Sequence, residues 1–173
     1  MFIAIVSMIT SVAFSQEFLS WSAVDTISKS KDILYSDAKN LIATNWKSSK
    51  SVIQLDDKEN GQIMIKGVVK QNITSLGFTL PGNVYYNYTI NFLFKDNKFK
   101  ITLNNVGYES ETLGRGWGNY LINTPQPEYP GAKVCGMQKK DYNKLIERLK
   151  NDLQGLFDLC VAELKKETKN DDW

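Results

Sequence analysis

Apolar and polar side chains alternate most regularly between residues 84 and 94. The apolar positions of this run are Val84, Tyr86, Tyr88, Ile90, Phe92 and Phe94. They alternate with Tyr85, Asn87, Thr89 and Asn91, which carry polar groups. Because successive side chains of a strand point to opposite faces of a sheet, the alternation predicts a long strand with one apolar and one polar face.

A second long strand is predicted directly after this one. Asp96-Asn97 is a turn signal, and the alternation resumes beyond it. The apolar positions are then Phe99, Ile101 and Leu103, and the polar ones are Lys98, Lys100, Thr102 and Asn104. The two strands form a predicted hairpin, and their unlike faces are typical of an antiparallel sheet that helices cover on a single side.

Three shorter strands complete the predicted sheet. Residues 17–24 show a brief alternation, and residues 51–55 and 62–70 lie on either side of a polar segment, DDKENG. Its last two residues, Asn60 and Gly61, supply the positive φ that a hairpin turn needs. Acidic and amide side chains collect naturally at such a turn, so this segment is not predicted to bind calcium.

Two segments repeat their apolar residues at helical spacing. Ser28 or Ser30 can cap the first helix, whose apolar stripe consists of Leu34, Ala38, Leu41, Ile42 and Trp46. The second helix is predicted at residues 138–167. Between sheet and helix, residues 107–136 show no sustained period and contain three prolines, which predicts a long irregular loop unless residues 120–122 form a further strand.

The first residues form an uncharged apolar stretch that ends in Ala13-Phe14-Ser15. This small-x-small spacing predicts a signal peptide at residues 1–15, followed by a single domain at residues 16–173. A retained membrane anchor or a buried first element is the weaker interpretation, because the stretch is short for a spanning helix. We therefore expect an exported protein of the periplasm, cell envelope or extracellular space, without a membrane span after cleavage.

Composition restricts the possible chemistry. The 173 residues include 21 Lys and Arg, 19 Asp and Glu and no His, for a net charge of +2. Without histidine there is no Ser-His-Asp or Cys-His triad and no imidazole metal site, and a charge this small does not indicate nucleic-acid binding. No catalytic residue, metal or cofactor is predicted. Cys160 lies far along the predicted second helix from Cys135, too far for a disulfide unless the helix breaks at Gly155. We therefore expect Cys160 to be a buried thiol.

Part of the sequence resembles a known family. The segments are KDILYSDA at residues 31–38, Trp46, and SVIQLDDKENGQI at residues 51–63. Together they resemble domain of unknown function 4468, with a Tyr early in the first helix, a Trp near its end, and a D-x-E-x-G-x-I hairpin. The resemblance spans residues 17–103. It implies an α+β domain of TBP-like fold, ordered β-α-β-β-β-β-α, with a twisted antiparallel sheet and two helices on one face. It also implies export by Gram-negative bacteria and no assigned activity.

Two sets of residues are candidates for binding. Polar side chains on the exposed sheet face can present amides and hydroxyls to a glycan or peptide: Asn87, Asn91 and Lys100 above all, with Thr89, Lys98, Thr102 and Asn104. Side chains of the long loop can stack on a sugar or anchor a protein: Arg115, Trp117, Tyr120 and Tyr129. Each set also has a plain structural interpretation, as a solvated sheet face or as a plug at the open end of the sheet.

The sequence favours an exported binding or interaction module whose partner is a protein or glycan of the cell envelope. Two alternatives remain. One is a carboxylate-based hydrolase that uses Glu109, Glu111 or Glu128 as acid or base. The other is a structural subunit of an envelope assembly that docks through the second helix or the loop.

Overall fold

A computed structural model describes residues 18–72, 83–108, 127–129, 131 and 138–166 of the chain. Within them the elements are β1 (Trp21–Thr26), α1 (Lys31–Asn45), α2 (Ser49–Val52), β2 (Ile53–Asp57), β3 (Gln62–Asn72), β4 (Asn83–Lys95), β5 (Lys98–Tyr108) and α4 (Lys139–Lys165). The strands form an antiparallel sheet in the order β1-β5-β4-β3-β2. The predicted order of strand, helix, four strands and helix is confirmed, with one additional helical turn, α2.

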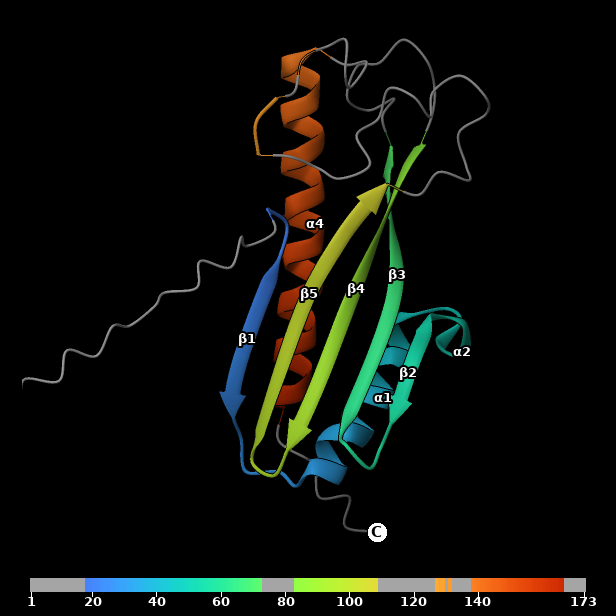
Figure 1. Cartoon of the computed structure of the whole chain (residues 1–173), viewed down its shortest axis with the longest axis vertical. Coiled ribbons are helices and arrows are strands. Elements are labelled where there is room, and N and C mark those ends of the chain that lie inside the picture. Colours follow the sequence, from blue (N-terminus) through green and yellow to red (C-terminus); the bar gives the residue numbers. More distant parts are fainter. Residues whose placement is uncertain (1–17, 73–82, 109–126, 130, 132–137, 167–173) are drawn as a thin grey trace, which may run out of the picture.

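Both long helices lie on the same face of the sheet. Figure 1 shows α4 running along the length of the sheet and α1 beside it, behind β3 and β2, while none of the helices of the described residues crosses the opposite face. The inward side chains of β3, β4 and β5 pack against the helices and are almost fully buried, among them Ile63, Ile65, Ile90, Phe92, Ile101 and Leu103. This arrangement confirms the prediction of a sheet covered on one side.

The β4–β5 hairpin is tied to the start of α1. Ser30 caps the helix, since its Oγ accepts a hydrogen bond from the Ile33 amide at 3.3 Å. The carboxylate of Asp96, in the hairpin turn, accepts from the Lys31 amide at 2.8 Å. The Asn97 amide donates to the Lys29 carbonyl at 2.8 Å, so backbone and side-chain bonds together fix the turn against the helix.

Left-handed backbone conformations occur where the chain turns tightly. Gly61 has φ of 63° in the β2–β3 turn, as its position after Asn60 predicts, and Asn97 has φ of 60° in the β4–β5 turn. Asn105, with φ of 53°, lies at a bulge in β5 opposite residues 87–89 of β4. Beyond the bulge Val106 is again buried, so the extra residue restores the inward alternation.

The long helix α4 buries one side chain per turn against the sheet and α1. Its buried residues are Tyr142, Leu145, Ile146, Leu149, Leu153, Phe157, Cys160 and Leu164. Cys160 is a free, buried thiol as expected, and burial raises its pKa to about 12. Among the helices of the described residues, none has the length and apolar character needed to cross a bilayer.

Several boundaries differ from those expected. The first strand lies at Trp21–Thr26 rather than at residues 17–24, and α2 occupies the start of the expected second strand. Strand β5 continues through Tyr108, so it takes the first two residues of the predicted loop, because the bulge at Asn105 allows pairing with β4 to continue. The rest of the loop, apart from residues 127–129 and 131, and the leader at residues 1–15 lie outside the described residues.

Candidate functional site

The sheet face that lacks helices, here called the open face, is less polar than the sequence predicts. Seven large apolar side chains are exposed in the described residues, and four of them project from this face: Val24, Leu55, Val68 and Leu93. Thr89, expected at the solvated surface, is only 4% exposed. The expectation of a wholly polar face was wrong, because outward positions of four different strands carry these aliphatic side chains.

Charge is distributed unequally across the sheet. Strands β3, β4 and β5 contain no acidic residue. Their five lysines all occupy exposed positions of the open face: Lys66, Lys70, Lys95, Lys98 and Lys100. An overall charge of +2 therefore conceals one strongly basic face.

The acids of the edge strands lie mostly on the helix side. Asp25 of β1 forms an ion pair with Lys165 of α4, which lowers the pKa of that carboxyl. Asp56 of β2 accepts hydrogen bonds from Lys39 and Tyr35 of α1. The Lys39 hydrogen bond, more than that of Tyr35, lowers the pKa of Asp56, whereas burial and the neighbouring carboxylate raise the pKa of Tyr35 to about 12. These carboxylates bind the layers together and leave the lysines of the open face unpaired.

Asp57 is the acidic strand residue that faces the open side. It lies opposite Gln62, and its carboxylate accepts from the amide of Asn60 at 3.0 Å and from Asn60 Nδ2 at 2.7 Å. These hydrogen bonds lower the pKa of Asp57 below its usual value. The carboxylate therefore stabilises its own turn instead of pairing with a lysine.

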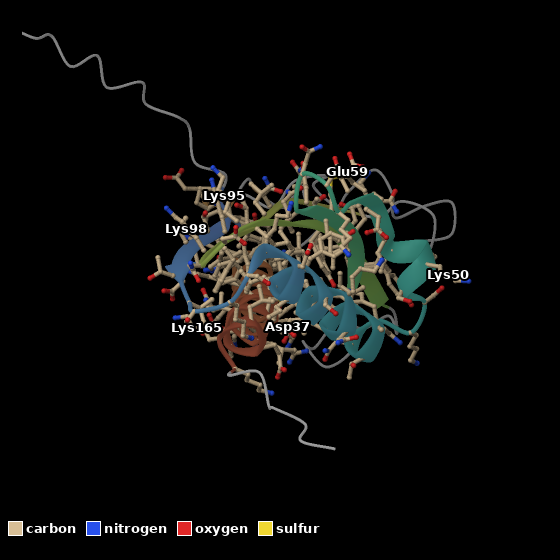
Figure 2. The ribbon with its side chains drawn as sticks, turned by 90° about the horizontal axis from the view of Figure 1, so that it is seen from below. Asp37, Lys50, Glu59, Lys95, Lys98 and Lys165 are labelled. Carbon is tan, nitrogen blue, oxygen red and sulfur yellow. The ribbon has the colours of Figure 1, made fainter. Side chains whose placement is uncertain are left out.

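A hollow of about 330 Å³ lies at the hairpin end of the open face. Its lining combines apolar and basic groups: Val24, Asn60, Leu93, Phe94, Lys95, Lys98, Phe99 and Lys100. The strand register explains this lining, since Val24 and Leu93 lie on either side of Lys100, and Lys95 lies directly opposite Lys98. Figure 2 shows Lys95 and Lys98 on the side of the sheet away from α4, with Lys165 and Asp37 on the helix side.

The three lysines of the hollow are not neutralised by an acidic side chain of the described residues. Lys95, Lys98 and Lys100 form no ion pair with any residue that the structure describes. Like charges directly opposite one another across a strand pair are destabilising, so the Lys95–Lys98 pair does not help the fold. An unpaired cluster of this kind is able to attract an anion.

A neutral band separates the hollow from the remaining lysines. Ser22, Thr102, Asn91 and Met64 lie side by side across four strands, and the hydroxyls of Ser22 and Thr102 are 3.4 Å apart. Next to it, the Oδ1 atom of Asn104 is buried without a hydrogen-bond partner among the described residues. The open face thus has a basic hollow at one end, a neutral middle and two further lysines beyond it.

The structure brings some of the predicted binding residues together. Asn91 and Lys100 are diagonal neighbours on the open face, and Asn87 lies farther along β4 on the same face. Tyr129 is half-buried, and its ring lies 5.7 Å from that of Tyr142 on α4, which places it with the helix layer. The other loop candidates, Arg115, Trp117 and Tyr120, lie outside the described residues.

Residues of the hollow that the sequence reasoning missed are Val24, Leu93 and Lys95. Lys98 and Lys100 were predicted on the polar face, but the lysines were not recognised as a cluster. A signal was available for the lysines, because Asp96 is the only acidic residue between positions 62 and 108. Val24 and Leu93 carry no such signal, since an apolar residue at the end of an alternating run does not reveal whether its face is covered. They are exposed because the helices of the described residues all lie on the other face of the sheet.

The described residues give no support to the alternative of a carboxylate-based hydrolase. Glu109 and Glu111 lie outside the described residues, and Glu128 is exposed. Among the described residues no three His, Cys, Asp or Glu side chains gather to hold a metal ion. Tyr35, Asp56 and Lys39 form a compact hydrogen-bonded set, but each holds α1 against β2.

The family model described as a domain of unknown function (DUF4468) with TBP-like fold matches residues 22–109, just over half of the chain. The chain belongs to the DUF4468 family. The match extends from β1 to the end of β5, so it includes the whole open face and excludes α4.

Solved structures show the same fold. A DUF4468 family protein from Bacteroides ovatus ATCC 8483 is 15% identical, with a TM-score of 0.59, over 87% of this chain and 88% of that one. A TBP-like protein from Parabacteroides distasonis ATCC 8503 is 12% identical, with a TM-score of 0.52, over 82% and 91% of the two chains. Comparison with curated proteins gives no match. The predicted family and TBP-like α+β fold are confirmed, and the family has no assigned activity.

Proposed function

We propose that this DUF4468 protein is an exported binding module that recognises an envelope partner through the open face of its sheet. The observation that supports this most is the coincidence on one face of exposed apolar side chains and unpaired lysines. Val24 is 54% exposed and Leu93 is 40% exposed, and both adjoin Lys100. Exposed apolar side chains contribute little to folding, and an apolar patch with polar groups around it is typical of an interaction surface.

Helix α4 offers less exposed apolar surface to a partner than the open face does. Of the large apolar residues of α4 within the described range, Leu159 is the exposed one, at 37%. The other large apolar side chains of that helix are buried or half-buried against the sheet and α1. Docking through α4, as a structural subunit would do, is therefore less favoured than binding through the open face.

Export is the second part of the proposal, and the apolar leader at residues 1–15 supports it. Cleavage after Ser15 leaves Gln16 as the first residue of the mature protein. N-terminal sequencing of the protein isolated from the cells that produce it tests this directly. Gln16 at the N-terminus is the expected result, and a chain that keeps Met1 contradicts export by cleavage.

Site-specific photo-crosslinking in the producing cells tests the binding face. A benzoylphenylalanine placed at Val24 reports on the open face, and the same group at Leu159 is the matched control, since both positions are exposed and apolar. We expect defined adducts from position 24 and none from position 159. Equal labelling from both positions, or adducts from position 159 alone, would contradict the proposal.

A further inference from the structure

We propose that the hollow at the hairpin end of the open face binds an amphipathic organic anion, a molecule with an acid group joined to a hydrocarbon body. This inference rests on the proposed function and names the class of ligand that the open face accepts. Its basis is the combination of lining residues: three ammonium groups around two exposed aliphatic side chains.

The arrangement of the lysines selects an anion. Lys95 and Lys98 occupy directly opposed positions of β4 and β5, and Lys100 lies two residues farther along the same face, about 7 Å from Lys98 along the strand. Each is exposed, and none has an ion-pair partner in the described part of the chain. A carboxylate or phosphate between them would relieve the repulsion of the opposed pair and form charge-assisted hydrogen bonds.

The neighbouring acidic side chains of the described residues do not form ion pairs with these three lysines. Asp57 lies on the same face, but its carboxylate is held by the amide and side chain of Asn60. Glu59 lies in the β2–β3 turn and is exposed, and no ion pair joins it to a lysine within the described residues. Asp96, in the hairpin turn itself, caps α1 through the Lys31 amide.

The two aliphatic side chains of the hollow favour a ligand with a hydrocarbon group. Val24 and Leu93 lie on either side of Lys100, so a hydrocarbon group in the hollow would contact both while its acid group meets the ammonium groups. Covering these side chains removes apolar surface from water, which a purely ionic ligand cannot do. The hollow, at about 330 Å³, lies at the lower end of the size range of small-molecule sites.

The distribution of charge favours a small anion over a long polyanion. Lys66 and Lys70 lie on β3 beyond the neutral band of Ser22, Thr102, Asn91 and Met64. A polyanion needs a continuous basic track, whereas this face concentrates three lysines around a single hollow. A single amphipathic molecule in solution is therefore the ligand we infer, rather than a bilayer surface or a nucleic acid.

Titration of the mature chain with three probes tests the class of ligand. Decanoate carries both the acid group and the hydrocarbon body, decyltrimethylammonium has a chain of the same length with the opposite charge, and acetate has the acid group alone. Calorimetry should give saturable binding of decanoate at least about tenfold tighter than that of either other probe. In methyl NMR spectra, decanoate should shift the signals of Val24 and Leu93. Equal binding of decyltrimethylammonium, or shifts confined to other methyl groups, would overturn the inference.

Matched lysine pairs test the location. The double variant Lys98→Gln/Lys100→Gln removes two charges from the hollow, and Lys66→Gln/Lys70→Gln removes two from the same face beyond the neutral band. The first pair should weaken decanoate binding by about tenfold, as expected for two solvent-exposed charge contacts, and the second should leave it unchanged. An equal loss in both variants would mean that the general charge of the face attracts the ligand, which would overturn the assignment of the hollow.

Two further outcomes separate this inference from the proposed function. If the mature chain does not bind decanoate but does sediment with phosphatidylglycerol vesicles and not with phosphatidylcholine vesicles, the inferred ligand is wrong and the basic face binds a membrane surface. If decanoate does not bind while crosslinking from position 24 still gives defined adducts, the inferred class of ligand is wrong, but the open face is still the binding surface. If decanoate binds but position 24 gives no adducts, the inferred ligand stands and the proposed recognition of an envelope partner is contradicted.

Discussion

The two faces of the sheet are built from the same strands and differ in almost every other respect. On the helix side, Ile90, Ile101 and Leu103 have no exposed surface, and the carboxylates of Asp25 and Asp56 pair with cations of the helices. On the open side, Leu93 and Val24 remain exposed beside unpaired lysines. One face supplies the stability of the fold, and the other presents groups that the fold does not use.

The comparison shows that alternating residues of one strand can serve two purposes, stability on one face and binding on the other. Each strand residue that points inward loses its contact with water and contributes hydrophobic stabilisation, whereas its neighbour can change without disturbing the core. The Lys95–Lys98 pair illustrates this freedom, because a directly opposed pair of like charges is tolerated only where the rest of the fold supplies the stability. We therefore expect substitutions to have unlike effects on the two faces.

The largest difference should come from two leucines on neighbouring strands. Leu103→Ala removes a fully buried side chain from β5, and we expect it to lower the free energy of unfolding by about 2–5 kcal/mol. Leu93→Ala removes the same group from the open face, where the expected loss is about 0.5 kcal/mol. Urea denaturation of both variants measures the difference. Equal losses would mean that the open face is covered in solution.

A glycine on the helix side gives a second test. A Cβ atom at Gly67 would lie 2.2 Å from the hydroxyl of Tyr88, which itself accepts a hydrogen bond from the Trp46 indole at 3.1 Å. Gly67→Ala should therefore displace this buried pair and destabilise the protein by about 1–3 kcal/mol. Thermal unfolding with near-ultraviolet circular dichroism would report both the loss and the altered tryptophan environment. A variant as stable as the parent, with an unchanged spectrum, would contradict the packing described here.

A substitution on the exposed side of α4 should increase the stability of the protein instead of lowering it. Gly155 lies within this helix, is exposed, and a Cβ atom placed there would have no atom within 4 Å among the described residues. Gly155→Ala should raise the free energy of unfolding by about 0.5–1 kcal/mol, because glycine is a poor helix former. Chemical denaturation measures the gain. A loss of stability at this position would show that α4 bends or is contacted there.

The smallest expected effect concerns the pH dependence of the Asp56 contact. The folded-state pKa of Asp56 is lowered from 3.8, so its contribution is present above that value and is lost as the pH falls through the folded pKa. Because the side chain of Asp56 is 43% exposed, the contribution is small. In Asp56→Asn the loss of stability between about pH 7 and about pH 3 should be smaller than in the parent. An identical loss in both proteins would show that the carboxylate does not couple to folding.

Much of this architecture is predictable because it depends on local periodicity. The alternation from Val84 to Phe94 and the helical stripe around Leu149 each specify a buried face without any knowledge of their partners. Ser30 and Gly61 likewise mark a helix start and a turn through chemistry that acts within a few residues. Such features follow from one segment of chain at a time.

The site is harder to predict because it depends on register between distant segments. Val24 and Leu93 are nearly seventy positions apart and meet around Lys100 only through the pairing of β1, β5 and β4. The sequence also does not predict which side chains of the open face remain exposed to solvent. The bulge at Asn105, which extends β5 into the predicted loop, depends on the same pairing.

Lysine acetylation footprinting tests most directly whether the open face is the surface that the protein uses. Lys95, Lys98 and Lys100 are exposed on that face, and Lys140 and Lys150 are exposed on α4. In the purified protein all five should react with an acetylating reagent, whereas in intact envelopes of the producing cells the three open-face lysines should be protected and the two helix lysines should still react. Equal reactivity of the open-face lysines in both preparations would contradict the account.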